Sequence, residues 1–352
     1  MTQSFWRCGA RIKSTASGFA TNANRTRDLG DQIIMEKMRT AVIGTGYLGR
    51  FHAQKYAAIE GSQLVAVADV NAESAQRVAA ECRTQATTDY RQLLGKVDAV
   101  SVVTPTPTHR VIAAAFLEAG AHVLVEKPIT TTVDEATELI AIAERCRRVL
   151  QVGHLERFNS AILALDGILT TPRFVESHRL APFKQRGTDV NVVLDLMIHD
   201  IDIIQNIVRS PITSIDAVGS SVFSGELDIA NARLRFANGC VANTTASRVS
   251  LKTERKLRLF QDDAYLSLDL HQKILTVIRK GEGVGPDGMP QVSIEERSLG
   301  DGDALKAEIE SFLQAAATGG VPVVSAEDGR RALATAIQIT QQVEASLRAV
   351  AR

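Results

Sequence analysis

Hydrophobic and polar residues follow two different periods along this chain. From residue 39 to residue 153, short β-branched and apolar runs alternate with stretches in which apolar residues recur every three or four positions. The runs are residues 39–43, 63–68, 99–103, 122–125 and 149–153, and the clearest helical stretches are residues 50–59 and 133–146. Strands that alternate with helices are typical of a parallel sheet covered by helices. We therefore predict an α/β domain over residues 38–157.

The second half of the chain has the shorter period of antiparallel strands. Apolar and polar residues alternate over residues 174–179, 212–223, 228–250, 256–270 and 273–280, with turn residues such as Asn238 and Gly239 between them. Residues 281–290 contain Gly and Pro and predict a loop, and amphipathic helices are expected over residues 304–320 and 326–347. These elements predict a second, α+β domain over residues 158–325.

The first 37 residues follow neither pattern. They are rich in Ser, Thr, Asn and Gly and carry six cationic against three anionic side chains. One interpretation is a transit peptide, because such segments are rich in Arg and Ser. The other, which we favour, is that translation starts at Met35 or Met38 and that residues 1–37 are a disordered or spurious extension.

Three glycines occupy the turn between the first predicted strand and the first predicted helix. In the run GTGYLG, Gly44 permits a tight turn, Gly46 lets the backbone approach a pyrophosphate, and Gly49 lets the helix pack closely on the strand. The helix N-terminus would supply N–H groups to the phosphates. The pattern therefore predicts a Rossmann dinucleotide-binding domain. The first cofactor contacts are expected at Gly44, Gly46, Tyr47, Leu48 and Gly49.

Asp69 ends the second predicted strand, 20 residues after Gly49. A carboxylate at this spacing accepts hydrogen bonds from the adenosine ribose hydroxyls. It would repel a 2′-phosphate, and the following Val70 and Asn71 supply no arginine to receive one. We therefore predict NAD rather than NADP as the cofactor. The alternative is that Asp69 only caps the following helix, which leaves the spacing unexplained.

Two more predicted strands end in polar residues. Thr104, Pro105 and His109 follow the run at residues 99–103, and Glu126 and Lys127 follow the run at residues 122–125. Ligands of open α/β sheets bind beyond the carboxyl ends of the strands. We therefore expect these residues to line the cofactor site as well.

Residues 192–208 predict a buried helix, because apolar residues cover nearly all of its surface. Asp195, His199 and Asp202 are spaced i, i+4 and i+7 and would form one polar stripe, whereas Asp200 lies off it and receives no role. Three interpretations compete: a structural hydrogen-bond network, a metal site, or acid/base catalysis in which His199 takes a hydroxyl proton and Asp195 orients the ring. The dinucleotide-binding pattern favours catalysis. Because no further ligands are evident in the chain, no metal is predicted.

From about Met38 to the C-terminus, the chain resembles the Gfo/Idh/MocA family of NAD(P)-dependent oxidoreductases. Four motifs carry the resemblance: GTGYLG, TPTPTH, EKP and a later D-x-x-x-H. The resemblance implies that Lys127 of EKP reaches the nicotinamide ribose and the substrate hydroxyl. It also implies a substrate domain with an open, mainly antiparallel sheet whose exposed face builds a homodimer or homotetramer. A last helix, over residues 326–350, is expected to pack back on the Rossmann domain.

The finer sequence is similar to one branch of this family. VGHLERFN, ESHRLAPFKQRG and DVNVVLDLMIHDIDII resemble bacterial nucleotide-sugar 3-dehydrogenases, which oxidise C3 of UDP-N-acetylglucosamine so that a partner aminotransferase can install a 3-amino group for lipid A. On this resemblance, Lys127, His199 and Asp195 are the catalytic residues, and the choice of Lys127 or His199 as proton acceptor stays open. The family pattern has Gly two residues before the histidine, where this chain has Met197.

A nucleotide sugar also needs cationic or amide donors for its diphosphate. Arg179 is the best candidate, because it ends the predicted strand at residues 174–179. The alternative for each cation is solvated surface charge. The predicted substrate contacts are Arg157, Asn159, Arg179, Asp195 and His199. Weaker candidates in the same segments are His154, Glu156, Lys184 and Arg186.

Composition excludes several classes of protein. The 352 residues include 40 Lys plus Arg and 40 Asp plus Glu, so the net charge of zero gives no electrostatic reason to expect nucleic acid. No apolar run approaches the roughly 18 residues of a membrane span. Four cysteines with neither zinc nor disulfide spacing indicate reduced thiols in a cytoplasmic protein. Two rival functions remain: a dehydrogenase of a free sugar or inositol, and a dinucleotide-sensing regulator without turnover.

Overall fold

The computed structural model describes residues 37–184, 190–284, 288–300 and 302–350. The predicted N-terminal extension, apart from Lys37, and the candidate Arg186 lie outside the described residues. Within the described ranges, no helix is both long and apolar enough to cross a membrane.

The first sheet consists of parallel strands in the order β3-β2-β1-β4-β5-β6. Because β1 pairs with β2 on one side and with β4 on the other, the strand order reverses there, which is where open α/β sheets bind their ligands. All four residues of β4 are buried, as expected of a strand covered on both faces. The strands are β1 (Met38–Ile43), β2 (Ser62–Ala68), β3 (Gln85–Thr87), β4 (Ala99–Val102), β5 (His122–Glu126) and β6 (Leu150–Gly153).

Helices cover both faces of this sheet. α1, α2 and α7 pack on one face, and α3, α4 and part of α8 pack on the other. Local sequence sets where the helices begin: Asn71 accepts a hydrogen bond from the Ser74 N–H at the start of α2, and Thr132 forms a capping box with Glu135 at the start of α4. The helices are α1 (Tyr47–Ala58), α2 (Ala72–Cys82), α3 (His109–Glu118), α4 (Val133–Cys146), α5 (Ser160–Leu163), α6 (Ile198–Val208), α7 (Ala304–Thr318) and α8 (Ala326–Val350).

The second sheet has the order β14-β13-β12-β11-β7-β10-β9-β8. Only the β7–β10 pair is parallel among its described strands. The predicted fold class, a Rossmann domain plus an α+β domain with an open and mainly antiparallel sheet, is therefore confirmed. The strands are β7 (Phe174–Leu180), β8 (Ile212–Ser220), β9 (Ile229–Phe236), β10 (Val241–Ser247), β11 (Glu254–Phe260), β12 (Ala264–Asp269), β13 (Ile274–Val284) and β14 (Pro290–Ser298).

One face of the second sheet is covered by helices and the other is open. α6 and α8 bury their apolar residues against the covered face. On the open face, polar side chains pair across strands, as Arg258 does with Glu176 at 2.8 Å. The first turns of α8 also contact α4 and β6 of the Rossmann domain. α8 therefore packs on elements of both domains.

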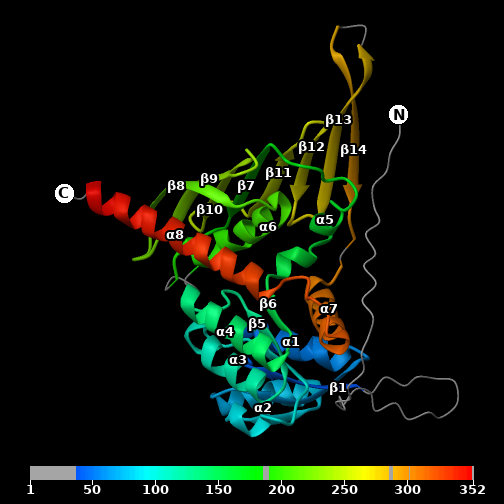
Figure 1. Ribbon diagram of the computed structural model, residues 1–352, viewed down its shortest axis with the longest axis vertical. Helices are drawn as coiled ribbons and strands as arrows, with labels where there is room; N and C mark the ends of the chain where they lie inside the picture. Colours follow the sequence, from blue (N-terminus) through cyan, green and yellow to red (C-terminus); the bar gives the residue numbers. More distant parts are fainter. Residues whose placement is uncertain (1–36, 185–189, 285–287, 301, 351–352) are drawn as a thin grey trace, which may run out of the picture. The chain divides into compact units, whose positions relative to one another are not determined.

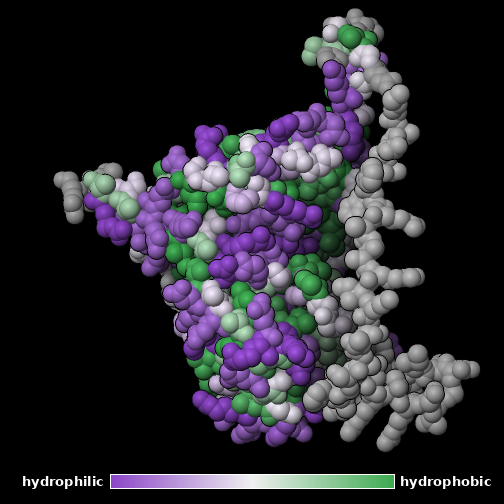
Figure 2. All heavy atoms as spheres, in the orientation of Figure 1, coloured by the Kyte–Doolittle hydropathy of each residue, from purple (hydrophilic) through white to green (hydrophobic). Residues whose placement is uncertain are grey.

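The segment predicted as a loop at residues 281–290 differs from the prediction. β13 continues to Val284 and β14 begins at Pro290, so the two strands extend into a long hairpin (Figure 1). Figure 2 shows hydrophobic side chains near its end, where Val284 and Met289 are exposed. The pattern does not reveal β14, because its side chains from residue 291 to residue 298 are all exposed and show no buried face.

The predicted helix at residues 192–208 begins as a π-helix. Val193–Met197 form the π-helical segment and α6 continues from Ile198. Asn191 starts the segment, because its Oδ1 accepts hydrogen bonds from the N–H groups of Val193 at 3.1 Å and Leu194 at 3.0 Å. π-helical segments are frequent at functional sites. Asp195 therefore lies in the π-helical segment and His199 in the α-helix that follows it.

Candidate active site

The glycine turn follows β1 where the sequence predicts it. Gly44 has φ of +93°, and a Cβ there would lie 2.3 Å from the carbonyl oxygen of Val103. A Cβ on Gly49 would lie 1.8 Å from the carbonyl oxygen of Gly44, whereas a Cβ on Gly46 would meet nothing within 4 Å. Gly44 and Gly49 are thus required by the turn itself. Gly46 leaves open the space that a pyrophosphate would occupy.

Asp69 ties the end of β2 to the glycine turn. Its Oδ2 accepts hydrogen bonds from the N–H of Thr45 at 2.6 Å and from Thr45 Oγ1 at 3.0 Å, and its Oδ1 accepts one from the Asn71 N–H at 2.9 Å. α2 is capped by Asn71 and not by Asp69. The alternative role of Asp69 as a helix cap therefore does not describe this site. The carboxylate is half-buried beside the turn, where the adenosine ribose of a dinucleotide is expected.

His109 joins the loops that follow β4 and β5. Its Nδ1 lies 2.9 Å from the Pro128 carbonyl oxygen and its Nε2 lies 2.8 Å from the Thr104 carbonyl oxygen. Burial lowers the pKa of His109, against the effect of these hydrogen bonds. The imidazole is buried, while the side chains of Thr104 and Pro105 reach the surface of the loop. His109 therefore fixes the two loops relative to each other.

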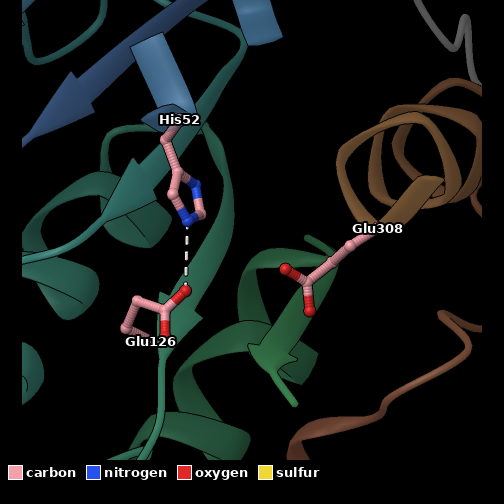
Figure 3. A group of neighbouring side chains, drawn as sticks. All are labelled: His52, Glu126 and Glu308. Carbon is pink, nitrogen blue, oxygen red and sulfur yellow. Dashed lines mark hydrogen bonds and ion pairs between the residues drawn. The ribbon is translucent and has the colours of Figure 1, made fainter. Parts of the chain in front are cut away.

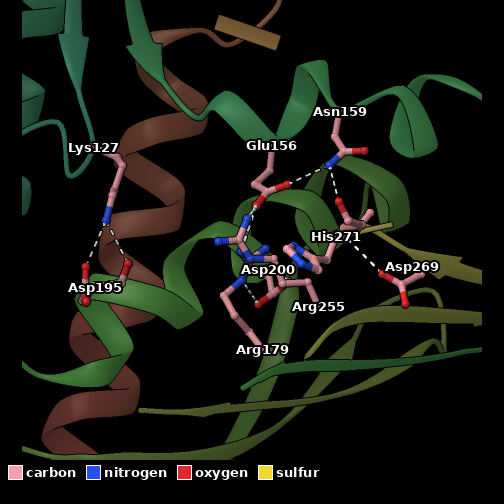
Figure 4. A network of polar contacts seen from close by, with 10 residues as sticks. Lys127, Glu156, Asn159, Arg179, Asp195, Asp200, Arg255, Asp269 and His271 are labelled. Carbon is pink, nitrogen blue, oxygen red and sulfur yellow. Dashed lines mark hydrogen bonds and ion pairs between the residues drawn. The ribbon is translucent and has the colours of Figure 1, made fainter. Parts of the chain in front are cut away.

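Lys127, which follows β5, reaches across to the π-helical segment. Its Nζ donates hydrogen bonds to the backbone oxygen of Asp195 at 2.8 Å and to Asp195 Oδ1 at 3.4 Å (Figure 4). The Lys127 side chain is 20% exposed. The structure therefore brings together two of the predicted catalytic residues, one from each domain.

His199 lies beside a second histidine, His154, with the ring centroids 6.3 Å apart and the rings perpendicular. His199 Nδ1 and both ring nitrogens of the buried His154 have no hydrogen-bond partner among the described residues. Burial, and then the positive charges of Lys127 and Arg179, hold the pKa of His199 well below its ordinary value of 6.5. Burial also lowers the pKa of His154. Both rings are therefore neutral at neutral pH, with nitrogens left to pair with a ligand.

Arg157 and Asp202 form a buried ion pair. Arg157 Nε and Nη2 donate to the two carboxylate oxygens of Asp202 at 2.6 and 2.8 Å, and the two side chains are 5% and 2% exposed. Asp202, which the sequence placed in the polar stripe, is thus paired with an arginine of the short helix after β6, residues Leu155–Phe158. Contact of Arg157 with a substrate stays a prediction, and this pairing argues against it.

Arg179 is held in the same way by two carboxylates. Its Nε and Nη2 donate to Asp200 at 2.8 and 3.2 Å, and its Nη1 donates to Glu156 Oε1 at 2.8 Å (Figure 4). Although burial opposes it, the charges of Asp200 and Glu156 hold the pKa of Arg179 above its usual range. Asp200, to which the sequence assigned no role, is therefore the main partner of Arg179. A diphosphate would have to compete with both carboxylates for this guanidinium.

Asn159 also makes contacts within the chain. Its Nδ2 donates to the carbonyl oxygen of Leu270 at 2.9 Å and to Glu156 Oε2 at 3.2 Å, and its Oδ1 accepts from the Ala161 N–H. The amide thus links the segment after β6 to the end of β12. Its predicted contact with a substrate stays a prediction.

Arg255 is a cation of this network that sequence reasoning missed. It lies opposite Arg179 in the β7–β11 register, its Nη1 is 3.3 Å from Glu156 Oε1, and its side chain is 45% exposed. Its charge also contributes to lowering the pKa of His199. The signal was available in the alternation of β11, because Arg255 shares its face of the strand with the buried Leu257 and Leu259.

The residues present fit a bound dinucleotide. Tyr47 and Leu48 begin α1 and lie next to the open space at Gly46, where the N–H groups of a first helical turn are suited to bind phosphate. Asp69 flanks one side of this turn, and the loops that carry Thr104 and Lys127 follow the neighbouring strands β4 and β5. The cofactor-binding residues predicted from the sequence therefore lie along one edge of the sheet.

Comparison with known proteins agrees with this geometry. Residues 38–154 match a model described as an oxidoreductase family with an NAD-binding Rossmann fold, and residues 162–267 match the GFO/IDH/MocA C-terminal domain. The chain is 45% identical over 314 residues to the UDP-N-acetylglucosamine 3-dehydrogenase of Acidithiobacillus ferrooxidans, covering 89% of this chain and 99% of that protein. A solved structure of that enzyme matches 88% of this chain and 99% of its own with a TM-score of 0.83.

More distant relatives share the architecture. The chain is 30% identical over 306 residues to inositol 2-dehydrogenase 1 of Mycolicibacterium vanbaalenii, covering 81% of this chain and 86% of that protein. A levoglucosan dehydrogenase solved in complex with NADH matches 88% of this chain and 97% of its own with a TM-score of 0.78 at 20% identity, a level that supports the fold alone.

Proposed function

Because the chain belongs to the Gfo/Idh/MocA family of NAD-binding oxidoreductases, we propose that it oxidises the C3 hydroxyl of UDP-N-acetylglucosamine to a ketone. The chain is an NAD-dependent dehydrogenase, and the sugar is the proposal. The observation that carries it is the similarity to UDP-N-acetylglucosamine 3-dehydrogenase through both domains and over nearly the whole of that protein. Membership in an oxidoreductase family also argues against the second rival function, a dinucleotide-sensing regulator that catalyses no reaction.

The proposed reaction uses Lys127 of the Rossmann domain and His199 of the second domain. When bound, NAD supplies the acceptor for the C3 hydride. His199, neutral because burial and neighbouring cations lower its pKa, takes the proton of the C3 hydroxyl. Lys127 donates a hydrogen bond to the same substrate oxygen, and Asp195 holds the lysine ammonium group in place. Lys127 and His199 can exchange the part of proton acceptor, and both are required in either case.

The diphosphate of the substrate is assigned to Arg255. Arg157 and Arg179 are buried in ion pairs with aspartates, whereas nearly half of the Arg255 side chain is exposed. Among the described residues, Arg255 contacts one carboxylate, that of Glu156 at 3.3 Å, and shares it with Arg179. Arginine is suited to phosphate because its planar guanidinium donates two parallel hydrogen bonds. Arg255 therefore replaces Arg179 as the favoured phosphate contact.

The proposal extends to the product and to the assembly. A 3-keto sugar is the substrate of an aminotransferase, and we place the chain before such an enzyme in the supply of a 3-amino sugar for lipid A. The open face of the second sheet, with its polar pairs such as Arg258 and Glu176, would join copies of the chain into a homodimer or homotetramer.

The test of the proposal is a substrate comparison that follows NADH absorbance. UDP-N-acetylglucosamine, free N-acetylglucosamine and myo-inositol are compared in the presence of a ketone trap, which removes the keto product and so prevents the reverse reaction. We expect the highest kcat/KM for UDP-N-acetylglucosamine. The second candidate is an inositol dehydrogenase, which the similarity to an inositol 2-dehydrogenase supports. Faster turnover of myo-inositol than of the nucleotide sugar would overturn our proposal in its favour.

A further inference from the structure

A buried carboxyl group that the proposed mechanism does not use lies close to Glu126, the residue that precedes Lys127. Glu308, on α7, is fully buried, and both of its carboxylate oxygens are without a hydrogen-bond partner among the described residues. Its ligand atom and those of His52 and Glu126 lie within 4.8 Å of one another (Figure 3). Glu126 immediately precedes Lys127. The cluster therefore joins α1, the end of β5 and α7 directly behind the proposed catalytic lysine.

Glu126 is placed by contacts on several sides. Its Oε1 lies 3.1 Å from His52 Nε2, and its Oε2 accepts a hydrogen bond from the Lys127 N–H at 3.3 Å. His52 Nδ1 in turn lies 3.1 Å from Ser101 Oγ. At the paired position of β6, a Cβ on Gly153 would lie 2.7 Å from Glu126 Oε1. The Glu126 carboxylate thus contacts His52 through one oxygen and the Lys127 backbone N–H through the other.

Among the described residues, the surroundings of Glu308 offer its carboxyl group no cationic partner. The polar groups near the carboxyl group are His52 and Tyr56 from α1 and Glu126 from β5, while Gln151 of β6 donates to the Glu308 backbone oxygen at 3.3 Å. No ion pair of Glu308 is found in the described part of the chain, and the carboxylate of Glu126 is its charged neighbour. An ionised carboxylate that is buried without a partner is strongly unfavourable. Burial, followed by the charge of Glu126, raises the pKa of Glu308 well above its usual value.

We propose that Glu308 is a positioning residue for the dehydrogenase reaction: a neutral carboxylic acid that directs its proton toward Glu126 and so keeps Glu126 and the Lys127 backbone in place. The separation of up to 4.8 Å suits two hydrogen bonds of about 2.8 Å that meet at one bridging water molecule. The positioning role rests on the proposed catalytic role of Lys127. The charge state of Glu308 does not depend on it.

A divalent cation is the other species that would neutralise two buried carboxylates. Imidazole and carboxylate are suitable ligands for several transition metals. However, His52 Nε2 and Glu126 Oε1 are already bonded to each other, so a cation would have to replace that hydrogen bond. A proton on Glu308 leaves it intact. We therefore favour the proton, and metal content is one outcome of the test.

The positioning role is tested with Glu308→Leu and Glu308→Gln. Glu308→Leu removes the proton and both oxygens, and we expect kcat to fall about tenfold or more with a smaller change in KM for NAD, because the misplaced groups include the proposed catalytic lysine. Glu308→Gln keeps a neutral hydrogen-bonding group and is expected to regain most of this loss. Glu310→Gln, at an exposed carboxylate of the same helix, is the matched control. A Glu308→Leu variant with native kcat would overturn the positioning role.

The charge state is tested separately by infrared spectroscopy on the full chain at neutral pH. We expect a carbonyl stretching band of a protonated carboxylic acid in the native protein, lost in Glu308→Gln. A native spectrum without that band, or stoichiometric metal that is lost in Glu308→Gln, would overturn the proposal. Because the native chain is measured first, the result stands even where Glu308→Leu does not fold. If Lys127→Ala stays active while the band is present, the proposed mechanism fails and the protonated Glu308 does not.

Discussion

Lys127 and Asp195, 68 residues apart in the chain, are joined by two hydrogen bonds from one ammonium group. The shorter bond, at 2.8 Å, goes to the backbone oxygen of Asp195, and the longer one, at 3.4 Å, goes to its carboxylate. A lysine of the Rossmann domain is thus held by the backbone of the π-helical segment of the second domain. The proposed catalytic site is complete only where the two domains meet.

This contact predicts a graded response to substitution. Lys127→Ala removes the group that would bond the substrate oxygen, and kcat is expected to fall about 100- to 10,000-fold, a larger effect than any change in the affinity for NAD. Asp195→Asn leaves the backbone bond at 2.8 Å intact and should lose less activity than Lys127→Ala. Steady-state kinetics and calorimetry of NAD binding measure both quantities. Near-native turnover of Lys127→Ala would rule out the proposed mechanism.

The lowered pKa of His199 predicts the acid side of the pH profile. Because the neutral ring is the proton acceptor, kcat/KM should hold at neutral pH and fall only well below pH 6.5, where the imidazole becomes protonated. Arg255→Gln removes one of the positive charges that lower this pKa, so the acid limb should move to higher pH. His199→Ala should remove the limb together with most of the activity. A native acid limb centred above pH 6.5 would contradict this assignment.

Substitution of the buried Arg157 should lower stability, whereas substitution of the half-exposed Arg255 should weaken substrate binding. Arg157→Met leaves the buried Asp202 without a partner and is expected to lower the free energy of unfolding by about 3–5 kcal/mol. Arg255→Met removes a half-exposed cation, so stability should change little while KM for UDP-N-acetylglucosamine rises about tenfold or more. Denaturant unfolding and steady-state kinetics separate the two effects. An unchanged KM in Arg255→Met would show that the diphosphate binds elsewhere.

Asp69 predicts the choice between the two nicotinamide cofactors. Asp69→Ala removes the negative charge that would repel a 2′-phosphate, so the ratio of kcat/KM for NAD to that for NADP should fall. The same change also removes the bonds to Thr45 in the glycine turn. Thr45→Val, which loosens the turn without changing charge, is therefore the control and should weaken both cofactors equally. Equal use of NAD and NADP by the native enzyme would refute this role of Asp69.

A substitution at Gly153 tests whether Glu126 holds the Lys127 backbone in place. Gly153→Ala would place a Cβ 2.7 Å from Glu126 Oε1, so the carboxylate has to move. Overpacking of this kind costs about 1–3 kcal/mol of stability, and we expect kcat to fall because the Lys127 backbone moves with Glu126. Gly61→Ala, where the new Cβ meets nothing within 4 Å, is the matched control. Both are measured by denaturant unfolding and initial rates, and equal behaviour of the two variants would count against the support role of Glu126.

The features that the sequence predicted correctly depend on neighbouring residues. Gly44 and Gly49 approach each other closely within one turn between a strand and a helix, so their spacing is visible in the sequence itself, although Gly44 also lies against the distant Val103. The alternation of strand and helix likewise predicted the parallel sheet, because it reflects which faces are covered. β14 escaped prediction for the same reason, since a strand with no buried face leaves no such pattern.

The sequence by itself thus determined the fold class, the cofactor-binding turn and the presence of Lys127 and His199 as candidates for catalysis. Only the tertiary structure decided which charged groups are already paired. Arg157 meets Asp202 across 45 residues and Arg179 meets Asp200 across 21, while Glu308 comes from α7 to lie beside Glu126, with no ion pair to any residue that the structure describes. The reason is that a buried charge needs a partner, and which partner it meets is set by how distant elements pack together and not by the residues beside it in the chain.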